Sequence, residues 1–333
     1  MRRALILLWL VHSATASAES TITLTLNEQG RQAAAEMGLD VPAFIAQSEA
    51  RIDELYRLSR TTELLKAFAN VAAFAQRGLG VDYDPDTGDV MVGVAATGFS
   101  GDIAIGATST LLTSSSVNAA VMAGVNLARW KLPRWTVFAN GFYIPTTVRA
   151  LEGDLFTLGA HVQYRLVPPT RPGHVRWTGV AVTTGVEHAR WRVGAVQTLE
   201  TNFRVIGTQS ERSVHISSAG TLEVRASTLG IPLEVTTGAR FFGVITPYVG
   251  VGAELATGSS EFEAALDSQL TINADSLPIG SARITGTDSS SPDTLAVHAL
   301  AGLQIHSRYV RVSFQGTIAD GVWAVAFGLR VAP

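Results

Sequence analysis

The chain has 333 residues, of which 47% are apolar and only 16% charged, with no cysteine and a formal net charge of -3. An average soluble domain has about 25% charged residues, so a surface this poor in charge faces either other protein or lipid. The missing cysteines exclude disulfides and cysteine-ligated zinc. The near-neutral charge gives no electrostatic footprint for nucleic acid, and 31 glycines argue against a helical bundle.

Residues 1–18 have the pattern of a secretory signal peptide. Arg2 and Arg3 form the charged start, an apolar run follows from Ala4 to Val11, and Ala16–Ala18 is a small-residue cleavage site. The apolar run is much shorter than the roughly 20 residues that a spanning helix needs. We expect export with cleavage after Ala18, and no lipid anchor, because no cysteine follows that site.

Residues 19–87 differ in kind from the rest and are expected to form a helical segment, in the periplasm or as a plug in the domain that follows. After an alternating run at 21–26, apolar residues recur every three or four positions along 27–76. This stripe comprises Ile52, Leu55, Leu58, Leu65, Phe68 and Ala72. The residues that follow predict a β-barrel whose lumen is lined with charge, as argued from their alternation below. Because an apolar stripe fits a charged lumen poorly, we expect two or three short helices that pack mainly against each other, below that barrel.

From residue 88 to residue 333 the apolar period is two. In the last stretch Trp323, Val325 and Phe327 alternate with small residues. A soluble sandwich shows the same alternation, but three features favour a barrel in lipid. The strands are about 10–13 residues long, aromatic residues lie near their ends, and short connections alternate with long polar ones.

The sequence therefore predicts a mainly β fold, an antiparallel transmembrane β-barrel of about twelve strands with an N-terminal helical segment. The expected strands are 90–98, 117–129, 135–144, 155–166, 175–187, 190–205, 212–226, 228–242, 246–257, 294–306, 308–318 and 321–331. Expected long loops are 101–116, 145–154 and 259–293. A hairpin at 262–273 and 280–287 would make fourteen strands, and loss of a pair would leave ten.

The segments Ile231–Val235, Pro247–Gly252 and Gly328–Val331 resemble strands of bacterial outer-membrane β-barrel proteins, and the resemblance extends from residues 229–331 back to about 88. Gly78–Gly80 is similar to the hatch of barrels of the long-chain fatty acid transporter type. The resemblance implies a place in the outer membrane, with its lipids and the barrel-assembly machinery as partners. One departure from this class is the end of the chain. Members of the class usually end on an aromatic residue that the barrel-assembly machinery reads, whereas the last aromatic residue here is Phe327.

Alternation places a set of ionisable side chains on the inner face, either lining an open channel or forming a salt-bridged core. These candidates are His161, Arg165, Arg190, Arg192, Glu234, Arg240, Glu254, His298, His306 and Arg311. Six aromatic residues near strand ends are the candidates for an interfacial girdle. They are Trp130, Trp135, Trp177, Trp191, Tyr248 and Trp323.

Two weaker motifs suggest other chemistry. His215 and Ser217 share a strand face, as in lipid hydrolases, with Glu187 or Glu223 as the acid. Asp82–Asp89 spaces carboxylates as calcium loops do, although a turn is the simpler interpretation. We expect neither catalytic activity, nor a metal, nor a cofactor.

The favoured function is a passive pore or transporter for small or hydrophobic solutes. The alternatives are a structural or adhesive surface barrel that works through its extracellular loops and, with less support, an outer-membrane lipid hydrolase. Solute and oligomeric state stay open.

Overall fold

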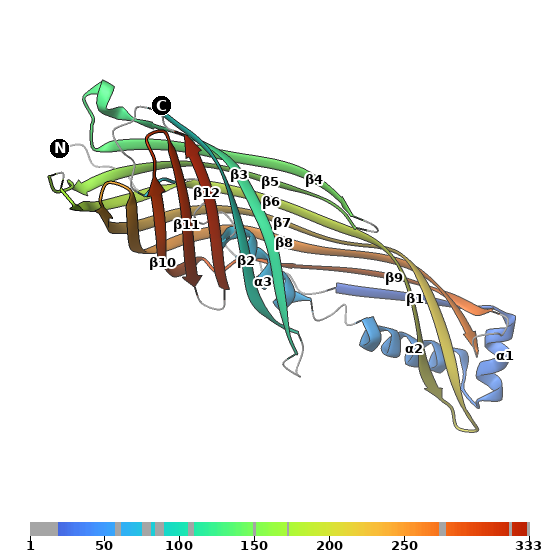
Figure 1. The fold of residues 1–333 in the computed structure, drawn as a ribbon. Helices are drawn as coiled ribbons and strands as arrows, with labels where there is room; N and C mark the ends of the chain where they lie inside the picture. Colours follow the sequence, from blue (N-terminus) through green and yellow to red (C-terminus); the bar gives the residue numbers. More distant parts are fainter. Residues whose placement is uncertain are drawn as a thin grey trace, which may run out of the picture.

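The computed structural model describes residues 19–56, 61–74, 81–83, 90–105, 110–148, 151–171, 173–272, 278–319 and 322–331. The signal peptide predicted at 1–18 lies outside these residues. The described part forms one antiparallel sheet of twelve strands and three α-helices (Figure 1). The strands are β1 (Glu19–Leu26), β2 (Val90–Ile105), β3 (Thr110–Asn126), β4 (Trp135–Val148), β5 (Leu151–Val167), β6 (Val175–Ile206), β7 (Glu211–Phe241), β8 (Ile245–Ile272), β9 (Pro278–Ser290), β10 (Leu295–His306), β11 (Val310–Ala319) and β12 (Val322–Val331).

Ten of the described strands close into a barrel. The hydrogen-bonded order runs from β8 through β10, β11, β12, β2, β3, β4, β5 and β6 to β7, and β7 pairs again with β8. The barrel predicted from the sequence is therefore confirmed. β9 and β1 are outside the ring, because β9 pairs with the outer part of β8, beyond the part that pairs with β10, and β1 pairs with β9.

The strands differ greatly in length, and this difference gives the molecule its two ends. β6, β7 and β8 have 32, 31 and 28 residues, whereas β10, β11 and β12 have 12, 10 and 10. The connections that follow β3, β5, β7 and β10 lie at one end, which we call the turn end. At the other end, the sheet end, the long strands continue far past the barrel (Figure 1).

Several predicted strand boundaries are wrong for this reason. The expected strands 175–187 and 190–205 are the single strand β6, and 212–226 and 228–242 are the single strand β7. Residues expected in long loops at 101–116, 145–154 and 259–293 are largely strand instead, in β2, β3, β4, β5, β8 and β9. A bilayer sets the length of the spanning part of a strand only, so it does not limit strands that leave the membrane.

Beyond the barrel, β1, β9 and the outer parts of β8, β7 and β6 form a five-stranded extension, which we call the projecting unit. Helices α1 (Glu28–Glu36) and α2 (Val41–Tyr56) cover the face that continues the barrel interior (Figure 1). Asn27 caps α1 by accepting a hydrogen bond from the Gly30 amide. Phe44 and Ile52 of α2 are completely buried against this sheet.

Helix α2 also joins the two outermost strands of the projecting unit. On β6, the Gln47 side chain exchanges two hydrogen bonds with the backbone of Ile206, at 3.2 and 3.3 Å. On β1, Glu49 accepts a hydrogen bond from the Leu24 amide. One helix thus satisfies backbone groups on both edge strands, and neither of these edge positions is left unpaired.

Helix α3 (Thr62–Phe74) lies inside the barrel at its sheet-end mouth (Figure 1). Its buried Val71, Ala72 and Phe74 pack with inward residues of β6, β7 and β12. The expectation that the helices pack mainly against each other below the barrel is therefore wrong. The lumen at this level is apolar, through Trp191, Ala189 and Ala226, so the apolar stripe does find a matching surface there.

The outer face of the barrel is apolar. On β12, Trp323, Val325, Phe327, Leu329 and Val331 are 39–53% exposed, and on β2 Val90, Val92 and Val94 are 46–52% exposed. From Trp323 to Val331 the strand is about 26 Å long, and at a tilt of about 40° it covers about 20 Å of the roughly 25 Å apolar band of a membrane barrel. The ring is thus a transmembrane barrel. None of the described helices is long and apolar enough to cross a bilayer.

The apolar belt gives the first prediction. Phe314 is 46% exposed on β11 and packs against Phe327 with ring centroids 5.1 Å apart. Phe314→Arg should lower the free energy of unfolding from a bilayer by about 2–4 kcal/mol, because the charge would sit in hydrocarbon. Thr221→Arg, on the exposed outer face of the projecting unit, is the control. Equal losses in a refolding assay would contradict the belt.

Candidate functional site

Most of the predicted lumen residues lie on the inner face of the barrel. His161, Glu234, Arg240, Glu254, His298, His306 and Arg311 are all at most 6% exposed. Arg165 is half-buried at a register shift in β5. The inner residues pair with one another: His161 lies 3.5 Å from Glu187, His298 lies 3.1 Å from Glu234, and Arg240 donates to Thr246.

Three predictions on β6 are wrong for one reason. Arg190 and Arg192 point outward, with 59% and 53% of their side chains exposed, and Trp191 points into the lumen at 4% exposure. The register shifts between Trp177 and Val180, where Gly179 has a φ of 85°. Such a β-bulge adds one residue to the strand, and this exchanges the inner and outer faces of every residue that follows.

Of the girdle candidates, Tyr248 is also wrong, since it is 5% exposed and its hydroxyl donates to Gln315 inside the barrel. The other four are exposed. Trp130, Trp135 and Trp177 lie near the turn end at 62%, 37% and 40% exposure, and Trp323, the second residue of β12, lies at the opposite rim.

The lumen near the turn end is filled by residues Val81–Tyr83, which connect α3 to β2 in sequence. All three are at most 8% exposed. Asp82 accepts hydrogen bonds from Arg311 at 2.8 Å and Gln304 at 2.7 Å, and its carboxylate lies 4.0 Å from Arg330. The backbone takes part too: Arg330 donates to the Val81 carbonyl at 2.6 Å, and Gln163 donates to the Asp82 carbonyl.

Tyr83 extends this contact to the opposite wall. Its hydroxyl donates to Glu234 on β7 at 2.8 Å, and its ring stacks on Tyr248 of β8 with centroids 5.2 Å apart. Val81–Tyr83 therefore bind side chains from β5, β7, β8, β10, β11 and β12. A buried carboxylate is stable only when it is paired and hydrogen-bonded, and Asp82 meets that condition here.

Helix α3 forms a second layer above this one. Phe68 meets Trp191 edge to face at 5.7 Å, and Phe74 meets His298 at 6.3 Å. Towards solvent, Lys66 pairs with Asp293 at 2.8 Å, and the Asn70 amide donates to the same carboxylate. A cavity of about 720 Å³ lies beside the helix, between Asn70 and Phe74 on one side and Glu254 and Val322 on the other.

At these two levels, described residues of the N-terminal segment therefore occupy the lumen. The sequence contained one sign of it, the run of acidic residues that begins at Asp82, which we interpreted as a turn or a calcium loop. Asp82 is instead the partner of Arg311. Residues 84–89 of that motif lie outside the described residues, so calcium binding there stays a hypothesis.

Both acids of the hydrolase hypothesis, and His215 itself, contact other partners. His215 contacts Asn202 at 2.9 Å, Glu187 lies beside His161 in the lumen, and Glu223 binds Arg192 and Arg225. Among the described residues no group of three or more His, Cys, Asp or Glu side chains is placed to hold a metal ion.

Three solved structures illustrate what the fold is similar to. The translocator domain of the autotransporter NalP from Neisseria meningitidis has 9% identity and a TM-score of 0.32, covering 87% of this chain and 98% of that chain. The COG4313 outer membrane channel from Pseudomonas putida F1 has 10% identity and a TM-score of 0.33, covering 75% and 97%. The P. putida toluene transporter TodX has 6% identity and a TM-score of 0.26, covering 75% and 91%.

All three are outer-membrane β-barrels, the class that the strand pattern resembles. No curated protein matches the chain. A family model described as Lsa36-like matches residues 15–332, and the chain belongs to this family.

The Asp82 contact gives the second prediction. Asp82→Asn leaves Arg311 and Arg330 buried without a carboxylate, which should destabilise the barrel by about 3–5 kcal/mol. The measurement is the unfolding midpoint in detergent. Asp267→Asn, on the exposed outer face of β8, is the matched control and should change the midpoint little. We call α3 and Val81–Tyr83 together the plug. If both variants unfold like the wild type, Asp82 does not hold the plug.

Proposed function

We propose that this Lsa36-like protein is a plugged outer-membrane barrel that anchors the projecting unit at the cell surface, where the unit binds extracellular macromolecules. The observation that carries the proposal is the contact of Asp82 with Arg311 inside the lumen. A segment held by six strands does not suit a permanently open pore. The alternative from the sequence, a surface barrel that works beyond the membrane, fits this geometry better.

The orientation follows from the two ends of the barrel. Membrane barrels of this class have short turns in the periplasm and longer elements outside the cell. Here the turn end has connections such as those at Leu127–Trp130 and Ser307, and at the sheet end the 28 to 32-residue strands β6, β7 and β8 continue past the barrel. This supports an extracellular projecting unit.

The uncovered face of the projecting unit has the character of a binding surface. No helix covers it in the described residues, and its exposed side chains are mostly short and polar. They are Thr21, Thr23 and Thr25 on β1, Ser281, Arg283 and Thr287 on β9, Ala265, Asp267 and Gln269 on β8, Ala219 and Thr221 on β7, and Thr198, Glu200, Asn202 and Arg204 on β6. Such a face offers hydroxyl groups at regular spacing along and across strands, which suits extended polymers.

A second candidate is gated passage of small or hydrophobic solutes, the function that the sequence favoured. The 720 Å³ cavity beside α3 supports it, because the helix has room on that side to shift. Its polar attachment to Asp293 through Lys66 and Asn70 is also partly exposed. In this version the plug moves before a solute passes.

The third prediction tests orientation. Because the chain has no cysteine, one introduced thiol can be labelled specifically. Gln209→Cys, at the β6–β7 tip, should react with a membrane-impermeant maleimide on intact cells, and Lys131→Cys, at the turn end, should react only after lysis. The reverse pattern would contradict the proposal.

The fourth prediction tests binding. Cells displaying the wild type should attach to surfaces coated with gelatin or heparin more than to surfaces coated with albumin. The double variant Thr23→Glu/Thr221→Glu should remove this difference, because it adds charge to the hydroxyl-rich face. Equal attachment of wild type and variant on every coating would contradict the assignment of this face.

For gated passage, the measurement is entry of a small hydrophobic dye into proteoliposomes. Lys66→Ala should speed entry if α3 moves with its Asp293 attachment. No entry with either protein would exclude this second candidate.

A further inference from the structure

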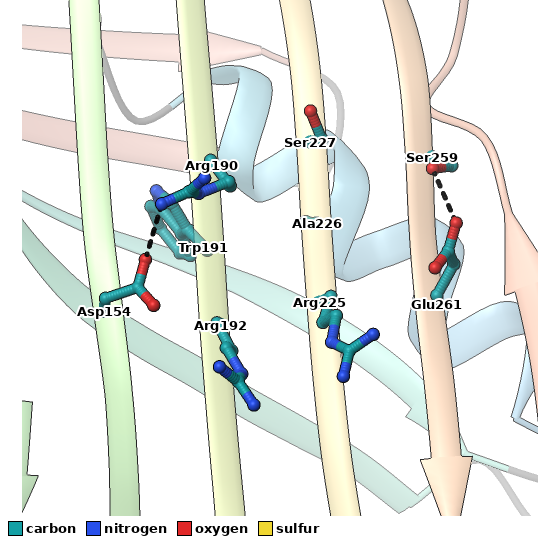
Figure 2. Close-up of a pocket in the computed structure, with 9 residues that line it drawn as sticks. All are labelled: Asp154, Arg190, Trp191, Arg192, Arg225, Ala226, Ser227, Ser259 and Glu261. Carbon is teal, nitrogen blue, oxygen red and sulfur yellow. Dashed lines mark hydrogen bonds and ion pairs between the residues drawn. The ribbon is translucent and has the colours of Figure 1, made fainter.

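Three arginines gather on the outer surface where the barrel becomes the projecting unit. Arg190 and Arg192 lie on β6 and Arg225 lies on the neighbouring strand β7, with 59%, 53% and 48% of their side chains exposed. They line a cavity of about 340 Å³ together with Asp154, Ser227, Ser259 and Glu261 (Figure 2). Neither the plug nor the projecting face uses this site.

The cluster lies directly above the apolar belt. Leu158, Val186 and Leu229 are 55%, 49% and 41% exposed on the outer face below it. On β7, Ser227 is two residues beyond Leu229 and Arg225 is four, about 7 and 13 Å along the strand. In the register of β6 and β7, Arg190 is opposite Ser227 and Arg192 is opposite Arg225. The guanidinium groups are therefore at the depth of lipid headgroups.

The arginines are arranged at a cost to the sheet. Arg192 and Arg225 are directly opposite each other on adjacent strands, and like charges in that position destabilise a sheet. Glu223 lies between them and accepts the Nε hydrogen bonds of both. The hydrogen bond from Arg225 and, to a smaller extent, that from Arg192 lower the pKa of the Glu223 carboxyl to about 2. The carboxylate therefore stays ionised and holds the two arginines in place.

Glu223 does not use all the donors of the two guanidinium groups. Arg192 uses Nε and Nη2 on this carboxylate, and Arg225 uses Nε, while its Nη2 lies 3.7 Å from Glu263. Nη1 of each has no hydrogen bond among the described residues. Arg190 makes one long contact with Asp154, at 3.4 Å (Figure 2). A forked set of donors of this kind matches the oxygens of a phosphate group.

We propose that this cluster binds the phosphate of a lipid headgroup from the leaflet around the barrel. The phosphate accepts hydrogen bonds from Arg190, Arg192 and Arg225, and the acyl chains lie against Leu158, Val186 and Leu229. Asp154 and Glu261 at the sides of the cavity limit the site to one phosphate and accept hydrogen bonds from hydroxyl or amine groups of the same headgroup.

The test uses the full chain in a detergent without phosphate. Phosphatidylglycerol is added, and the lipid retained is measured by native mass spectrometry. Replacing the three arginines by glutamine should weaken retention about tenfold, because several charge-assisted hydrogen bonds are lost. Arg204→Gln is the matched control, since Arg204 is also an exposed, ion-paired arginine on β6, but lies far out on the projecting unit. It should retain lipid like the wild type.

Two further arms identify the source of the phosphate. Monogalactosyl diacylglycerol, which has acyl chains and no phosphate, should be retained poorly by every variant. Inorganic phosphate should not displace phosphatidylglycerol at equal concentration, because it lacks the contact with the apolar belt. Displacement by inorganic phosphate would overturn the lipid assignment, and equal retention by the triple variant would overturn the site.

A variant that keeps all three arginines guards against a folding defect. Ser227→Glu adds a carboxylate inside the cavity and should also weaken retention of phosphatidylglycerol, with an unfolding midpoint close to that of the wild type. Unchanged retention in a folded Ser227→Glu protein would contradict the proposal.

Discussion

The contact between Asp82 and the arginines of β11 and β12 is the interaction on which the rest of the structure depends. Arg311, Gln304 and Arg330 surround a carboxylate that has no exposed surface. A barrel of ten strands lies between those that side chains fill and those that enclose a water channel. Here the chain supplies its own filling, so inner charges that would otherwise need water are satisfied by Val81–Tyr83.

The same segment fixes where the N-terminal region lies. Val81–Tyr83 are in the lumen near the turn end, and α3 precedes them at the sheet-end mouth, so α1 and α2 are delivered to the sheet end. There the long strands need a cover for their apolar inner face. Phe44 and Ile52 provide it, and Gln47 and Glu49 satisfy strand edges. The plug and the projecting unit are therefore two consequences of one chain path.

The features that could be predicted from the sequence are those that depend on neighbouring residues, and the features that were missed depend on contacts between distant ones. Period-two alternation identified the barrel and most of its inner residues, because facing direction is a local property of a strand. It failed after Gly179, where one extra residue exchanged the faces of Arg190, Trp191 and Arg192. It also failed for strand length, since nothing in residues 187–190 or 226–228 ends a strand, and bilayer thickness alone suggested the breaks. Alternation could not predict the plug, because the ion pair of Asp82 and Arg311 joins residues 229 positions apart in sequence.

The most direct test of the account is the single-channel conductance of the wild-type chain in a planar bilayer. A lumen held by Asp82 and covered by α3 predicts no stable conductance steps, and Asp82→Asn should introduce brief openings, since the segment is then held by weaker contacts. Stable open steps in the wild type, unchanged in Asp82→Asn, would contradict a plugged anchor and return the protein to the class of passive pores.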